Sequence, residues 1–91
     1  MKYEGQAFEV GRLLSTPGVA AKFKPEDIAK CHARHIVGDW GDICEHDRGV
    51  NAHALEHGER LMSVYEIDED SLWVITEADR SVTTYLLPEE Y

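Results

Sequence analysis

The chain has 91 residues, of which 43% are hydrophobic, so we expect a single domain (1–91) with a modest core. Eighteen acidic residues stand against nine lysines and arginines, which gives a formal net charge of −9 and a sequence pI near 4.8. Such a surface repels phosphate backbones, so we expect no general nucleic-acid binding. The charge fits simple solubility, a basic protein partner, or mimicry of nucleic acid in a basic groove.

Membrane insertion and secretion are not expected. No run of about 18 apolar residues occurs, and the first residues, MKYEGQAFEVGR, lack the apolar stretch of a signal peptide. The expected location is therefore the cytoplasm. Cys31 and Cys44 are too few for the disulfide framework of a secreted protein, and we expect reduced thiols.

The chain begins with one predicted strand and one short helix. The stretch 6–14 (QAFEVGRLL) alternates apolar and polar residues and ends in two leucines, which indicates a strand. Ser15 or Thr16 can act as an N-cap, with Pro17 at the first helical position. A short helix through VAAKF (19–23) is therefore expected.

Two further helices are predicted. Pro25 and the two acids after it open a helix that runs to Gly38. After a loop over 38–49, Asp47 is the expected N-cap of a third helix that stops at Gly58. The second helix has an apolar stripe of Ile28, Cys31, His32 and His35, flanked by Ala29, Ala33 and Ile36. The third is expected to bury Val50, Ala54 and Leu55.

From Arg60 the hydrophobic period changes from 3.6 to 2. Three segments rich in Val, Ile, Thr, Tyr and Trp have the length of strands: 60–67, 71–76 and 81–87. Turns at 68–71 and 77–81 join them into an antiparallel meander, and Pro88 ends the last strand. The expected fold is α+β, with an N-terminal strand and two or three short helices on one face of a three- to four-stranded antiparallel sheet.

Three segments of the chain have a recognisable pattern: RHIVGDWGD (34–42), HDRGVNAHALEHGERLMSVY (46–65) and LWVITEADRSVTTYLLPEEY (72–91). On these segments the C-terminal half resembles a family of short bacterial proteins from plasmids and other mobile elements. GRLLSTPGVA (11–20) fits the opening strand and turn of the same family. The resemblance covers nearly the whole chain, but it implies no reaction, because such proteins are known as plasmid-related products without an established activity.

NAHALEHGER (51–60) contains the pattern H-x-x-E-H, which resembles the zinc helix of one class of metalloprotease. His53 and His57 can face one ion from the same side of a helix. They fall on variable positions of the plasmid-related pattern, however, and the pattern arises easily among five histidines in 26 residues. We therefore expect no metal site, no cofactor and no hydrolase activity.

Two segments carry polar and aromatic residues that a simple fold does not require: RHIVGDWGD and TEADRS (76–81). Their plain interpretation is structural, with His35 as a core histidine bonded to backbone or to Asp39, Trp40 as a cap over the core, and a surface ion pair in the turn. The functional hypothesis places seven residues around one cleft between the helices and the sheet edge. They are His35, Asp39, Trp40, Arg60, Glu77, Asp79 and Arg80.

The sequence is compatible with three functions. The favoured one is a protein-interaction or inhibitory module that binds a basic partner, in its sharpest form by occupying the nucleic-acid channel of a host-defence complex. The alternatives are a small-ligand or metal-binding module and a ribonuclease-like toxin enzyme, the latter by fold analogy alone. Hydrophobic edge strands such as 81–87 would also permit a homodimer.

Overall fold

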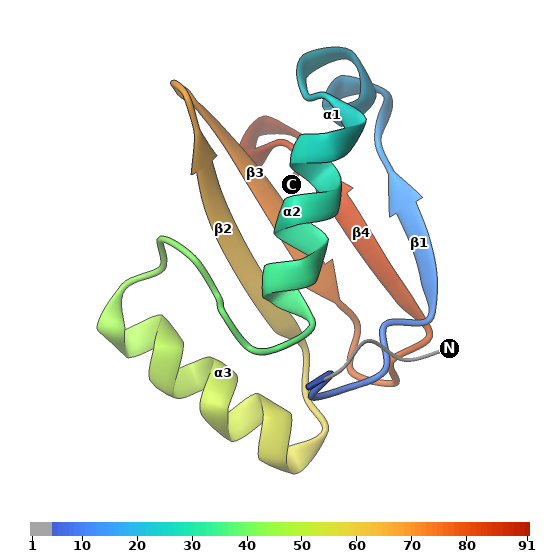
Figure 1. The fold of residues 1–91 in the computed structure, drawn as a ribbon. Helices are drawn as coiled ribbons and strands as arrows, with labels where there is room; N and C mark the ends of the chain where they lie inside the picture. The colour runs from blue at the N-terminus through green and yellow to red at the C-terminus, as the bar shows by residue number, and fades with distance from the viewer. Residues whose placement is uncertain (1–4) are drawn as a thin grey trace.

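The computed structural model describes residues 5–91, which form a four-stranded sheet flanked by helices (Figure 1). The predicted α+β class is confirmed, and so is the C-terminal meander: β2, β3 and β4 pair antiparallel. The N-terminal strand β1 lies parallel to β4, so the sheet is mixed rather than wholly antiparallel. The spatial order is β1-β4-β3-β2, with bounds β1 (Arg12–Ser15), β2 (Leu61–Ile67), β3 (Asp70–Thr76) and β4 (Val82–Leu86).

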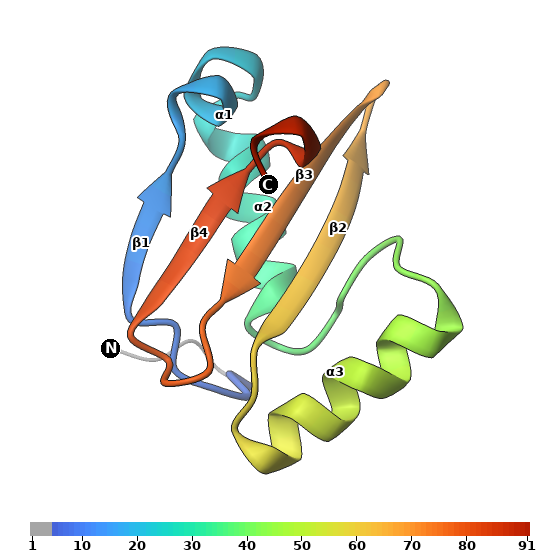
Figure 2. The same cartoon turned by 180° about the vertical axis from the view of Figure 1, so that it is seen from behind.

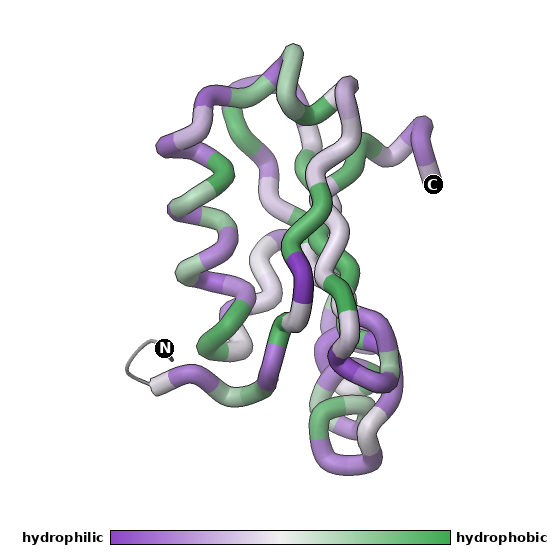
Figure 3. Tube along the Cα trace, turned by 90° about the vertical axis from the view of Figure 1, so that its right-hand side faces the viewer, coloured by the Kyte–Doolittle hydropathy of each residue, from purple (hydrophilic) through white to green (hydrophobic). Residues whose placement is uncertain are grey.

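One long helix covers a face of this sheet, and another lies beside the edge strand β2. The helices are α1 (Pro17–Lys22), α2 (Pro25–His35), α3 (Glu45–His57) and a 3-10 turn, η1 (Pro88–Glu90). α2 runs across one face, whereas the other face has no α-helix lying across its strands (Figure 2). The edge-on view places α3 beside the sheet on the side away from α2 (Figure 3). α3 therefore does not lie across the α2 face, although its buried Ala54 packs with Leu61 and Phe8.

β1 is much shorter than the predicted strand over 6–14. It begins only after Gly11, which has a φ of +65° and lies so close to the Ser81 carbonyl that a Cβ would overlap it. The residues before Gly11 turn away from the sheet and pass below the end of α2, where the Ala7 N–H donates to the Ile36 carbonyl at 2.8 Å. Phe8 is buried there rather than in a strand.

α1 and α2 begin where the prolines predict. The Thr16 hydroxyl accepts the Val19 N–H at 3.2 Å, so Thr16 is the N-cap of α1. α2 starts at Pro25 but ends at His35, three residues before the predicted stop. Of the predicted stripe and its flanks, Cys31, His32, His35 and Ile36 are buried, Ile28 is half-buried, and Ala29 and Ala33 are exposed.

α3 differs most from its prediction. It begins at Glu45, with Cys44 rather than Asp47 as the N-cap, and ends as expected at Gly58, which has a φ of +70°. Its buried residues are Asn51 and Ala54, whereas Val50 and Leu55 are 50% and 36% exposed. The Asn51 side chain bonds to both the N–H and the carbonyl of Met62 on β2. The helix is thereby attached to the strand along a narrow line, and the residues on either side of Asn51 and Ala54 stay exposed.

The two edges of the sheet are β1 and β2. The predicted hydrophobic edge over 81–87 is wrong, because β4 pairs with a strand on each side.

The core on the α2 face has two clusters. One contains Val19, Phe23, Cys31, Tyr65, Leu72, Val74, Tyr85 and Leu87, and the other contains Phe8, Trp40, Ala54 and Leu61. No helix within residues 5–91 has the length and apolar character needed to cross a bilayer.

Candidate functional site

His35 lies between the end of α2 and the sheet and is fully buried. Its Nδ1 is 2.6 Å from the Ser63 hydroxyl, and its Nε2 is 2.9 Å from the Thr76 hydroxyl. The network continues through the Thr83 hydroxyl, which donates to the Val10 carbonyl at 2.7 Å. His35 thus bonds to hydroxyls rather than to backbone or Asp39, and both ring nitrogens are occupied.

Burial also fixes the charge of this ring. Desolvation, reinforced by the positive potential of His32 and Arg80, lowers the pKa of His35 to about 3. The imidazole is therefore neutral at pH 7. With both nitrogens bonded inside the core, it does not present a proton donor or acceptor to a substrate.

Trp40, Phe8 and Arg80 pack together beside the His35 ring. The rings of His35 and Trp40 meet edge to face with centroids 5.6 Å apart, and Phe8 packs against both. Arg80 lies 5.8 Å from the Phe8 ring and donates to the carbonyls of Glu59 and Ala54, at 2.6 and 3.4 Å. Arg80 therefore ties the end of α3 to the β3–β4 turn.

Asp39 is held at the surface by α2. Its carboxylate accepts two hydrogen bonds from Arg34, at 2.8 and 3.1 Å, and these bonds lower the pKa of Asp39. Its carbonyl accepts the Tyr65 hydroxyl at 2.6 Å. The Arg34 guanidinium lies 4.7 Å from the centre of the Tyr65 ring. Asp39 thus anchors the loop after α2 to the sheet.

The remaining predicted residues bond to other groups of the protein. Arg60 Nε lies 3.5 Å from a carboxylate oxygen of Glu77, and its guanidinium donates to the Tyr91 hydroxyl at 2.9 Å. The Asp79 carboxylate accepts hydrogen bonds from the Ser81 hydroxyl, at 2.5 Å, and from the Ser81 N–H, at 3.0 Å, and these bonds lower the pKa of Asp79.

The two predicted loops therefore lie at the same end of the sheet, but packing joins them rather than a cleft. Phe8 contacts Trp40 from one loop and lies under Arg80 from the other. Of the three pockets described below, one is lined by Arg60 and none by the other six predicted residues. The seven residues divide into a buried group around His35 and separate surface pairs.

The histidines of the H-x-x-E-H pattern face each other on α3. The rings of His53 and His57 stack with centroids 3.9 Å apart, His53 Nδ1 lies 2.9 Å from a Glu59 carboxylate oxygen, and His57 Nδ1 lies 2.9 Å from the His53 carbonyl. Within residues 5–91 no group of three or more His, Cys, Asp or Glu side chains is arranged to hold a metal ion. Burial raises the pKa of the Cys31 thiol to about 11, which disfavours a thiolate there.

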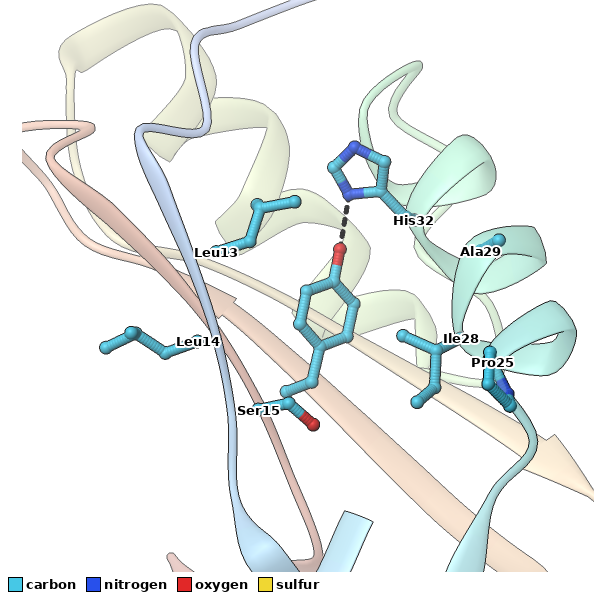
Figure 4. A pocket seen from close by; sticks show the side chains of 8 residues that line it. Leu13, Leu14, Ser15, Pro25, Ile28, Ala29 and His32 are labelled. Carbon is cyan, nitrogen blue, oxygen red and sulfur yellow. Dashed lines mark hydrogen bonds between the residues drawn. The ribbon is translucent and has the colours of Figure 1, made fainter. Parts of the chain in front are cut away.

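A recess lies between β1 and α2 and is named the β1 groove. Its volume is about 310 Å³. Leu13 projects across it toward His32, whereas Leu14 points to the opposite side of the strand (Figure 4). The groove is lined by Leu13, Leu14, Ser15, Pro25, Ile28, Ala29, His32 and Tyr85. At its floor His32 Nδ1 and the Tyr85 hydroxyl form a hydrogen bond.

A second recess lies between α3 and β2 and is named the α3 groove. Its volume is about 190 Å³, and its lining is Ile43, Asp47, Val50, Asn51, Arg60, Met62 and Val64. Val50 also lines a third, shallower hollow with His46, Gly49, His53 and Glu59. Both hollows therefore meet along the exposed flank of α3.

Sequence reasoning missed both grooves. The sequence pattern predicted that Val50 is buried. It placed Leu13 and Leu14 in a longer strand, but it did not indicate whether another element covers either side of that strand. The available signal was weak: two adjacent leucines in a segment of only four strand residues.

A comparison of the chain with protein-family models, with curated proteins and with solved structures finds no match.

Proposed function

We propose that this protein acts by binding another protein, and that the partner inserts a basic segment with apolar side chains into the α3 groove. The observation that carries the proposal is the outward position of Val50, half exposed beside Met62 and Val64. Apolar side chains that meet in a recess, with polar groups at its rim, are typical of a protein-binding surface.

The charge of this half of the molecule supports a basic partner. Residues 39–91 contain 14 of the 18 acidic residues but only three of the nine lysines and arginines, a net charge of −11. Asp47 lines the groove itself, and Arg60, the cation in the lining, pairs with Glu77. A basic segment would therefore be attracted from a distance and then held by apolar contacts.

The same charge is consistent with the inhibitory form of this function. A protein that normally binds nucleic acid offers a basic channel, and an acidic surface can compete for it. The plasmid-related resemblance is compatible with a host-defence target and stays a prediction. The geometry favours binding over a ribonuclease-like reaction, because the buried His35 and the arginines near it are engaged with the protein's own groups.

The proposal can be tested by capture and then by direct titration. The immobilised protein would be exposed to nuclease-treated bacterial lysate, and any retained protein would be identified, purified and titrated calorimetrically at several salt concentrations. We expect a basic protein whose affinity falls steeply as salt rises, since screening weakens long-range attraction.

Two matched variants locate the site. Val50→Lys puts a positive charge into the groove and should weaken binding by about tenfold or more. Leu55→Lys makes the same change at an exposed apolar position about 140° around the same helix, and it should leave the affinity nearly unchanged. Equal losses in the two variants, or a partner indifferent to salt, would contradict the proposal.

A further inference from the structure

The outer edge of β1 is open, and the outer edge of β2 is not. On β2 the outward backbone groups of alternate residues have partners: Met62 bonds with Asn51, Val64 with the loop after α2, and the Glu66 N–H with Asp42. On β1 alternate residues bond to β4, so the N–H and carbonyl groups of Leu13 and Ser15 point away from β4 toward the open edge. Within residues 5–91 no backbone or side-chain group bonds to these outward groups.

An apolar recess lies directly beside this open edge. Leu13 is 53% exposed, and its side chain stands at the mouth of the β1 groove on the same face of the sheet as Tyr85. Ala29 of α2 forms part of the opposite wall (Figure 4). A strand added next to β1 would place every second side chain on this face, above the groove.

We propose that β1 and the β1 groove together bind an extended segment of a partner protein as an added fifth strand. The backbone of the segment bonds to Leu13 and Ser15, and its alternate apolar side chains enter the groove against Ala29. This is the general mode in which an exposed sheet edge provides the affinity and adjoining pockets provide the selectivity. The site lies on different elements from the α3 groove and is independent of it.

The charges around the groove define the segment further. None of the lining side chains is acidic. Arg12 begins β1 at one end, and Lys24 precedes Pro25 at the other; both lie in the 5–38 part, which carries five lysines and arginines against three acids. The fitting segment is therefore apolar at alternate positions and acidic at its ends, the opposite of the partner expected at the α3 groove.

A second copy of this chain fits the edge less well. β1 has only four residues, so pairing with another β1 would bury far less than the roughly 1,200 Å² that stable interfaces need. Each copy also carries a net charge of −9, which opposes close approach. A short peptide carries far less charge than a second copy, so it meets less repulsion, and its side chains also fill the groove.

The test uses the full chain, labelled with ¹⁵N, and a capped heptapeptide with aspartate at both ends and leucine alternating with threonine between them. We expect chemical-shift changes centred on β1 and α2. Hydrogen exchange at the Leu13 and Ser15 amides should slow by about tenfold or more at saturation, because these N–H groups acquire partners. A peptide with lysine in place of both aspartates should bind several-fold more weakly.

Variants separate groove binding from nonspecific contact. Ala29→Trp fills the groove and should reduce the affinity by about tenfold, whereas Ala33→Trp, one turn further along α2 and also exposed, should not. Arg12→Glu should weaken the aspartate peptide and improve the lysine peptide. Backbone spectra that otherwise match the unsubstituted protein show that each variant is folded.

Three results would overturn the inference. The first is no binding at millimolar peptide, and the second is a set of shifts that leaves the Leu13 and Ser15 amides unprotected. The third is protection of these amides that depends on protein concentration without peptide, which would assign the edge to a second copy of the chain.

Discussion

His35 illustrates how this small core accommodates a polar ring. Every buried side-chain nitrogen and oxygen in the described residues has a hydrogen-bond partner, and His35 achieves this through two hydroxyls of the sheet. The residue pattern indicated a buried stripe along α2, but it did not predict these partners. Ser63 and Thr76 lie 28 and 41 positions away in the sequence, and only the sheet register places them together.

The depressed pKa of His35 makes folding stability depend on pH. In the unfolded chain a histidine takes up a proton near pH 6.5, whereas folded His35 stays neutral down to about pH 3. The unfolded state therefore binds more protons in this window, and the free energy of unfolding falls as the pH is lowered from 6.5 toward 3. The contribution of His35 amounts to about 1.4 kcal/mol per pH unit within the window.

Urea unfolding of the wild type and His35→Gln at several pH values measures this contribution. Other groups, such as Asp39, also lose stability in acid, so the informative quantity is the difference between the two proteins. We expect the wild-type advantage to shrink steadily below pH 6.5. His53→Gln, at an exposed position, should follow the wild type, and a constant gap between wild type and His35→Gln would show that His35 is not the group responsible.

At the scale of elements, helix starts were easier to predict than helix faces. Pro17 and Pro25 fix the first turns of α1 and α2 locally, through their own φ and their missing N–H groups, so the sequence alone is informative. The inner face of α3 depends instead on what lies opposite. Since Asn51 attaches the helix to the edge of β2, Val50 and Leu55 fall on opposite flanks and stay exposed.

The loop before α3 gives a matched pair of glycine predictions. Gly41 pairs with Val64 at a φ of +77°, and a Cβ there would overlap the Val64 carbonyl. Gly41→Ala should therefore lower the free energy of unfolding by about 3 kcal/mol or more. Gly49 lies within α3 with open space around it, so Gly49→Ala should raise the same quantity by about 0.5–1 kcal/mol.

Thermal and urea unfolding of the two variants provide the measurement. Fraying of the β2 edge in Gly41→Ala should also appear as faster hydrogen exchange at the Val64 amide, which donates to the Trp40 carbonyl. If both alanine variants changed stability in the same direction, the close approach of the loop to β2 would be in doubt.

Across the whole molecule, the sequence predicted the class of fold better than the candidate site. The three C-terminal strands follow from local alternation and short turns, so the meander could be predicted. The parallel pairing of β1 with β4 joins residues about 70 positions apart, and no local pattern contains it. The β1 groove depends on that pairing. The polar residues predicted to line a cleft, such as His35 and Arg80, instead form hydrogen bonds with other parts of the protein.

Charge distribution is also a property of the whole molecule, and it leads to a prediction about stability. The tip of the β2–β3 hairpin carries Glu66, Asp68, Glu69 and Asp70 within five residues, in the part of the chain (39–91) with a net charge of −11. Lys22 offsets part of this through its 3.5 Å contact with Asp70. Glu69→Lys should therefore reduce repulsion and raise the melting temperature by about 1–2 °C at low salt.

Scanning calorimetry at about 20 mM and about 0.5 M NaCl distinguishes repulsion from a change in packing, because screening at the higher concentration acts over only a few ångströms. The gain from Glu69→Lys should shrink toward zero in high salt, and Glu69→Gln should give about half of it in low salt. A gain that persists undiminished in high salt would mean that the turn conformation, rather than the acidic charge of this half of the molecule, limits stability there.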